Sequence, residues 1–246
     1  MSATTMQHPR LMARLAGVFY LIITACALFS YLYVREQVVN VDDMAQTAAN
    51  FVAHEQLYRI GFFASLIVCI CNLPMGFIVC ELLKVVNVQL ARLALLFIIA
   101  SATLEAVNLF NYIEPLFTFT LPEIRNAFAP EQVQALARGP IRMWGYAFSV
   151  SLTFFGVYCA LIGVLVLRSK FFPAILGVLL MTAGATYWVN SARLFLDLPI
   201  PYIQWVTFFG EQAFALWLLI VGLNEAKWRE RAAAFNSAEP YAAQSS

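Results

Sequence analysis

Three charged side chains stand inside long apolar stretches of the sequence: Glu105, Arg193 and Glu211. A charged group near the centre of a bilayer costs about 2.5 to 3.5 kcal/mol, so such groups usually face a protein interior or a water-filled cavity. A carboxylate in that position can accept a proton or bind a cation, and a guanidinium can hold an anionic group. These residues are the first candidates for a functional site.

Other polar residues recur at helical spacing beside these charges. At about 100° per residue, Ser101, Glu105, Asn108 and Tyr112 occupy one face of a helix. Similar stripes are formed by Thr186, Asn190, Arg193 and Asp197, by Gln204, Thr207 and Glu211, by Arg142, Tyr146, Ser149 and Thr153, and by Tyr58, Ser65, Cys69 and Asn72. We predict that the stripes line one outward-facing polar cavity, whose ligand-binding residues are Glu105, Asn108, Tyr112, Tyr146, Asn190, Arg193, Gln204 and Glu211.

Within this cavity we expect Glu105, Arg193 and Glu211 to converge. A guanidinium between two carboxylates offsets their charge and leaves a net negative site suited to a proton or a cation. The structural alternative is that polar stripes join membrane helices, at about 0.6 kcal/mol per interhelical hydrogen bond, and that Arg193 pairs with Asp197. An interfacial aromatic belt is the favoured role of four large rings, which are Tyr112, Trp144, Tyr202 and Trp205.

The composition identifies the elements that must position these residues. Of 246 residues, 62% are hydrophobic and 12% are charged, whereas a soluble domain has about half apolar and a quarter charged residues. Apolar runs long enough to cross about 30 Å of hydrocarbon lie at 13–34, 57–83, 91–114, 142–167, 173–196 and 202–225. We therefore predict an all-α fold, a polytopic bundle of six transmembrane helices with short extracytoplasmic helices.

Lysine and arginine are enriched on one side of these runs, and the positive-inside rule assigns that side to the cytoplasm. Both termini are then cytoplasmic, and the expected location is the bacterial inner (plasma) membrane. The predicted organisation is a cytoplasmic tail at 1–12, a transmembrane domain at 13–225 and a second cytoplasmic tail at 226–246.

The two longer outer connections have helical signals of their own. Asp42 or Asp43 can cap a helix that ends near His54. In the other connection, Pro130 opens a helix that Gly139 is expected to close. We predict that residues 122–139 pack as short helices over the cavity mouth. The segment and the residue before it carry apolar side chains that need a surface to pack on, namely Leu121, Ile124, Phe128, Val133 and Leu136.

Several chemistries lack the residues they need. Both histidines, His8 and His54, lie outside the apolar runs, and all five cysteines lie inside them as small hydrophobes. We therefore predict no metal site, no cofactor and no catalytic residues. Enzymatic activity is the less favoured hypothesis. The net charge of +1 gives no basis for binding nucleic acid.

Three stretches resemble a bacterial membrane family known as domain of unknown function 4386. They are Arg14–Tyr20, Glu55–Gly61, and the hairpin from Arg168 through Pro173 to Gly184. The resemblance extends over most of residues 14–225. It implies a multi-span membrane protein and brings no established activity.

The favoured function is binding or sensing a small polar or amphipathic ligand. The alternatives are a small secondary transporter or proton-coupled carrier, and a structural or regulatory subunit of a membrane complex. The expected partners are the lipid bilayer, a small molecule, and a second copy or another membrane protein. Gly156, Ala160 and Gly163 are small enough to mediate helix contact, either within the bundle or between chains.

Overall fold

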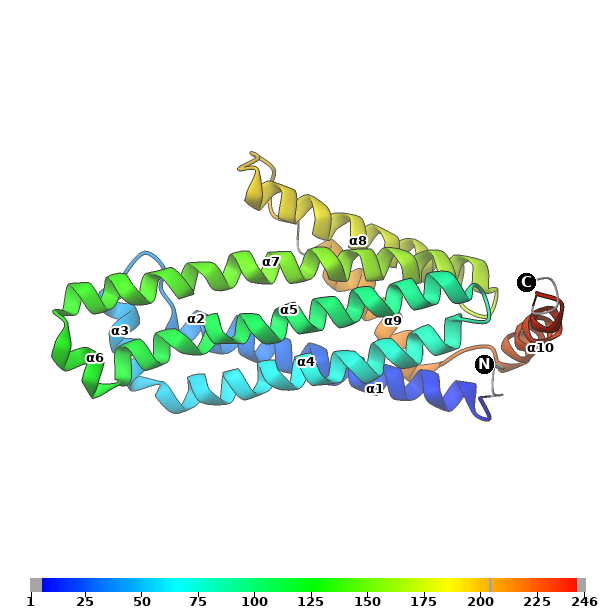
Figure 1. The fold of residues 1–246 in the computed structure, drawn as a ribbon, viewed down its shortest axis with the longest axis horizontal. Helices are drawn as coiled ribbons and strands as arrows, with labels where there is room; N and C mark the ends of the chain where they lie inside the picture. Colours follow the sequence, from blue (N-terminus) through cyan, green and yellow to red (C-terminus); the bar gives the residue numbers. More distant parts are fainter. Residues whose placement is uncertain (1–5, 204, 243–246) are drawn as a thin grey trace. The chain divides into compact units, whose positions relative to one another are not determined.

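A computed structural model describes residues 6–203 and 205–242, and Figure 1 shows its helices. The elements are α1 (Pro9–Ala27), the π-helix η1 (Leu28–Val34), α2 (Arg35–Val38), α3 (Met44–Ala53), α4 (Glu55–Leu83), α5 (Val88–Thr120), α6 (Pro122–Ala127), α7 (Pro130–Ser169), α8 (Ala174–Phe195), α9 (Trp205–Ile220) and α10 (Glu225–Ala242). No strand occurs among the described residues. The predicted all-α class is confirmed.

The membrane character of the helices is also confirmed. Five helical stretches are long and apolar enough to cross a bilayer: 9–38, 55–83, 88–120, 130–169 and 174–195. The pair α9 and α10, bent by 95°, gives a sixth if it counts as one span. Proline stands inside α4, α5 and α7, and these helices continue through it. Lipid cannot satisfy exposed backbone groups, which favours continuous helices.

The prediction that Gly139 closes a helix is wrong. α7 runs unbroken for 40 residues and passes through Gly139 and Pro140. The residues that hold it together are Val133, Ala137, Ile141 and Trp144, which follow one another at helical spacing and are all buried. Their burial outweighs the local preference of a Gly-Pro pair for a helix end.

The connection between α2 and α4 agrees with its prediction. α3 begins after Asp43, whose carboxylate accepts a hydrogen bond of 2.9 Å from the Gln46 N–H. His54 follows the last helical residue, and α4 starts at Glu55. An N-cap of this kind contributes about 1 kcal/mol to helix stability.

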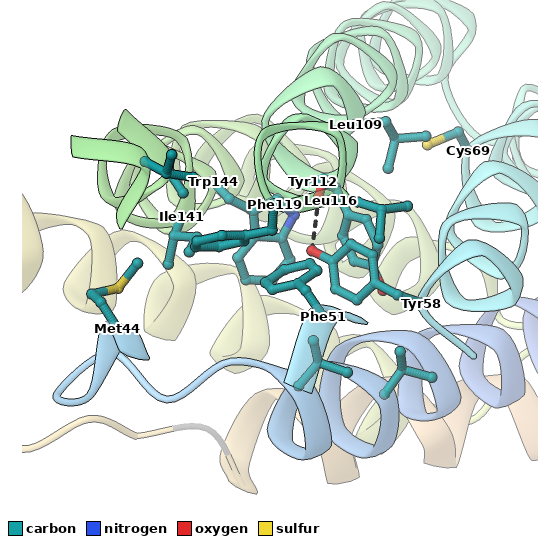
Figure 2. Packing of buried hydrophobic residues seen from close by; sticks show 14 residues of the cluster. Met44, Phe51, Tyr58, Cys69, Leu109, Tyr112, Leu116, Phe119, Ile141 and Trp144 are labelled. Atoms are coloured by element: carbon teal, nitrogen blue, oxygen red, sulfur yellow. Dashed lines mark hydrogen bonds between the residues drawn. The ribbon is translucent and has the colours of Figure 1, made fainter. Parts of the chain in front are cut away.

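The chain forms two compact units. Unit 1 consists of Met1–Leu21, Asn72–Ser101 and Leu152–Ser246, and unit 2 of Ile22–Cys71 and Ala102–Ser151. The core of unit 2 is a cluster of buried side chains from η1, α2, α3, α4, α5 and α7. Figure 2 shows its aromatic centre, where Tyr58 stacks on Tyr112 at 4.5 Å and donates a hydrogen bond to the Tyr112 carbonyl at 2.7 Å.

In unit 1, glycines allow α7 and α8 to pack backbone against backbone. A Cβ on Gly184 would lie 2.5 Å from the Gly156 carbonyl oxygen, and one on Gly177 would lie 2.7 Å from that of Gly163. The two contacts are seven residues apart on both helices. The small residues expected to mediate helix contact therefore pack within the chain; they are Gly156, Ala160 and Gly163.

Candidate functional site

The centre of the candidate site in unit 2 is Glu105 on α5. Its side chain is 6% exposed, and its Oε1 accepts a hydrogen bond of 3.0 Å from the Tyr31 hydroxyl. Its Oε2 is buried and has no hydrogen-bond partner among the residues that the structure describes. An unpaired buried carboxylate oxygen is costly because it has lost its water and gained nothing in exchange. Glu105 can therefore still take a proton or a donor group.

The π-helix η1 brings Tyr31 to this carboxylate. A π-helix widens the helical turn, so the residues in it point in directions that an α-helix would not give them. The neighbouring Ser30 is fully buried, lies 2.6 Å from the Ser65 hydroxyl and donates to the Tyr112 hydroxyl at 3.2 Å. Side chains from η1 thus reach both α4 and α5.

An aromatic group adjoins the carboxylate. The ring of Tyr31 lies 5.4 Å from that of Trp144 and 5.2 Å from that of Phe148, and the last two rings are stacked at 5.2 Å. The Arg35 guanidinium lies over Trp144 at 4.1 Å and donates to the Ile141 carbonyl at 3.1 Å. The surroundings of Tyr31 already accommodate one cation on a ring face.

A second buried polar atom in this group has no partner. Trp144 is 8% exposed, and its indole Nε1 finds no hydrogen-bond acceptor among the described residues. Its backbone carbonyl accepts a hydrogen bond of 3.1 Å from the Asn108 side chain, which is one helical turn from Glu105. Of the predicted site residues, Glu105, Asn108 and Tyr112 therefore lie together in unit 2.

The second predicted carboxylate, Glu211, lies in unit 1 on α9 and is fully engaged. Its Oε2 accepts a hydrogen bond of 2.9 Å from the Tyr20 hydroxyl, and its Oε1 accepts one from the Tyr187 hydroxyl. These tyrosines belong to α1 and α8. Glu211 thus links three helices, which is the structural role that polar groups have between membrane helices.

Asn190 also has a structural role in unit 1. Its side chain donates to the Ile203 carbonyl at 3.0 Å and accepts from the Ile203 N–H at 3.1 Å. Ile203 belongs to the non-helical connection before α9, in which Pro199 and Pro201 have no N–H. An irregular segment near lipid needs such internal partners for its backbone groups.

Arg193 forms no ion pair with either carboxylate among the described residues. Its guanidinium lies over the Tyr202 ring at 5.4 Å, and its Nε has no hydrogen-bond partner within residues 6–203 and 205–242. Tyr146 is 44% exposed on α7, whereas Gln204 lies outside the described residues. Because Glu105 belongs to unit 2 and the other two charges to unit 1, their convergence stays a prediction.

The aromatic residues divide into two groups. Tyr202 and Trp205 are 53% and 72% exposed, as an interfacial belt requires. Tyr112 and Trp144 are buried in the unit 2 cluster, so the belt interpretation is wrong for them.

The segment 122–139, which was expected to pack over the cavity mouth, is only partly packed. Val133 belongs to the unit 2 cluster and Ile124 packs against it. The remaining apolar residues, Leu121, Phe128 and Leu136, are exposed.

Sequence reasoning missed the tyrosine partners of both carboxylates. Tyr20 and Tyr31 lie eleven residues apart in the first apolar run, and eleven residues are close to three full helical turns. That spacing was the available signal, but the register change introduced by η1 cannot be seen in the sequence.

Comparison with known proteins gives a family and no activity. The family described as Domain of unknown function (DUF4386) matches residues 15–222. Over 69 residues the chain is 39% identical to an uncharacterized protein of Archaeoglobus fulgidus, and this match covers 28% of the chain and 42% of that protein. The chain thus matches less than half the length of this curated relative. No solved structure matches it.

Proposed function

This chain belongs to the family described as Domain of unknown function (DUF4386), and we propose that it binds a small organic cation in unit 2, with Glu105 as the anionic group. The observation that carries the proposal is the buried Oε2 of Glu105, for which the described residues provide no hydrogen-bond partner. A protonated amine would supply both the missing donor and the missing charge.

The surroundings of Glu105 favour an organic cation over a hydrated metal ion. The rings of Tyr31, Trp144 and Phe148 offer apolar and π surfaces, and aromatic groups of this kind recognise ammonium ligands. Among the residues that the structure describes, no second carboxylate forms a hydrogen bond with Glu105. Glu211, in contrast, has both oxygens occupied by tyrosines, which makes it the weaker candidate for a ligand.

The test uses the purified full chain and a series of primary alkylammonium ions as probes. Wild type is expected to be stabilised against heat in proportion to ligand concentration, because the ligand binds only the folded state. Glu105→Gln should weaken binding about 10- to 100-fold, because the variant loses one charge-assisted hydrogen bond to the probe. Tyr31→Phe should have a smaller effect. Isothermal titration calorimetry measures both.

The matched control is Glu114→Gln, which changes another carboxylate on α5. Glu114 accepts a hydrogen bond of 2.7 Å from the Thr118 hydroxyl and is outside the aromatic group. It should bind the probes like wild type. Equal binding by Glu105→Gln, or no stabilisation of wild type by any alkylammonium ion, would contradict the proposal. Accumulation of a bound probe inside proteoliposomes would favour the transport alternative.

We also propose that the chain crosses the inner membrane six times and has both termini in the cytoplasm. Contacts within unit 1 support an even number of crossings. Arg229 of α10 donates to the Gln7 carbonyl at 2.9 Å, and Trp228 donates to the Leu82 carbonyl at 2.9 Å. Residues before α1, at the end of α4 and in α10 thus meet at one end of unit 1, and this supports α9 as the sixth crossing.

Reporter fusions at the C-terminus test this topology. Green fluorescent protein should fluoresce there, and alkaline phosphatase should be inactive, because its disulfides form only outside the cytoplasm. The same reporters fused within the connection between α2 and α3 should give the opposite pattern. An active phosphatase at the C-terminus would exclude six crossings with a cytoplasmic N-terminus.

A further inference from the structure

Unit 1 contains a cavity of about 550 Å³ that is separate from Glu211 and its tyrosines. Its walls come from the start of α1, the connection between α7 and α8, the end of α9 and the start of α10. This volume is in the range of sites for small ligands, about 300 to 1,000 Å³. None of the polar stripes of the sequence predicts it.

The charged side chains around the cavity are mainly cationic. Arg10, Lys170 and Lys227 line it, together with one carboxylate, Glu225. Glu225 is held by Arg229 in an ion pair of 2.6 Å within α10. Among the residues that the structure describes, none of the three lining cations forms an ion pair. The cavity is therefore electropositive, and α10 adds the positive end of its helix dipole.

The remaining wall is aromatic and aliphatic. Phe171, Phe172 and Trp217 contribute to it, with Val221 and Leu223. The indole Nε1 of Trp217 is buried and has no hydrogen-bond partner in the described part of the chain. It supplies a neutral donor beside the cations, so the lining combines donors for an anionic group with surface for an apolar one.

Hydrogen bonds between the surrounding connections fix the shape of the cavity. The Asn224 N–H donates to the Phe171 carbonyl at 3.1 Å, and Arg10 Nε donates to the Val221 carbonyl at 3.2 Å. α9 ends at Ile220, and the turn that follows contains Gly222, whose φ of +76° suits glycine. A Cβ at Gly222 would lie 3.0 Å from Arg10 Cγ. The same turn thus ends α9 and holds Arg10 at the cavity.

We propose that this cavity binds a phosphate group, as presented by the headgroup of an anionic phospholipid. Arg10, Lys170 and Lys227 neutralise the phosphate, Trp217 Nε1 donates a hydrogen bond, and the apolar wall accepts the glycerol and the first methylenes of the chains. The basic residues cluster on the side that the positive-inside rule assigns to the cytoplasm, where anionic headgroups are available.

The test compares phosphatidylglycerol and phosphatidylcholine with identical acyl chains, titrated into the purified full chain and quantified by native mass spectrometry. Wild type should prefer phosphatidylglycerol. The double variant Lys170→Gln/Lys227→Gln should bind it about 25-fold more weakly, since each cation near a headgroup contributes about fivefold. The matched control Arg168→Gln/Arg231→Gln removes two exposed cations from α7 and α10 that do not line the cavity, and should retain the preference.

Inorganic phosphate as a competitor distinguishes the source of the group. Displacement of bound phosphatidylglycerol only above about 10 mM phosphate supports the lipid, because the apolar wall then contributes to affinity. Displacement at micromolar phosphate, with no preference between the lipids, would overturn the lipid in favour of a soluble phosphate. If both double variants lose the same affinity for phosphatidylglycerol, the lipid does not bind in the cavity and is attracted only by diffuse surface charge.

Discussion

Gly184→Leu is expected to lower the thermal midpoint of the purified chain by about 6 to 12 °C. The reason is the 2.5 Å between a Cβ at this position and the Gly156 carbonyl oxygen. Backbone cannot move aside as a flexible side chain can, so α7 and α8 must separate. Overpacking of this kind costs about 3 kcal/mol or more. Differential scanning fluorimetry in detergent measures the shift.

Gly145→Leu is the matched control for this substitution. It makes the same chemical change in α7, but nothing lies within 4 Å of a Cβ at Gly145. Its midpoint should stay at or slightly above the wild-type value, because leucine forms helix better than glycine. If both variants lose the same stability, the close approach of α7 and α8 is not the cause.

Glu211→Ala should lower the midpoint by on the order of 10 °C. The substitution leaves the hydroxyls of Tyr20 and Tyr187 without their acceptor in a buried position. Each unsatisfied hydroxyl costs about 1 to 3 kcal/mol, and a cavity adds to that cost. Glu230→Ala, which changes an exposed carboxylate on α10, should leave the midpoint unchanged.

A compensating variant separates lost hydrogen bonds from lost packing. Glu211→Met combined with Tyr20→Phe and Tyr187→Phe removes all three polar groups at once and fills the volume. It should recover most of the stability, because replacing both partners of a buried polar contact costs little. A triple variant no more stable than Glu211→Ala would show that the carboxylate acts through something other than these two hydroxyls.

The periodic features of the structure could be predicted from the sequence. The apolar runs identify the spans, Asp43 identifies the start of α3, and the stripe of Ser101, Glu105, Asn108 and Tyr112 is buried throughout. Each of these signals is local, since hydrophobic periodicity and capping depend on residues within one or two turns. On α7, Ile141, Trp144 and Phe148 form the face that packs in the unit 2 cluster, and Tyr146 of the predicted stripe is 44% exposed.

The contacts of the carboxylates could not be predicted, since they depend on register between distant segments. Tyr31 reaches Glu105 because η1 changes the helical phase within the first span, and the residues of η1 have no composition that marks a π-helix. Tyr20 and Tyr187 meet Glu211 from helices 191 and 24 residues away in sequence. Such meetings follow from how whole helices pack.

The length of α9 bears on which membranes suit the protein. Its 16 residues rise about 24 Å, some 6 Å less than a typical hydrocarbon thickness of about 30 Å. In the proposed six-crossing topology, the non-helical residues before α9 complete this crossing, and Asn190 satisfies the backbone of Ile203 among them. A thinner bilayer removes the need for that extension, at a mismatch energy of fractions of a kcal/mol per Å. Hydrophobic mismatch thus favours thin lipid regions around this face of unit 1.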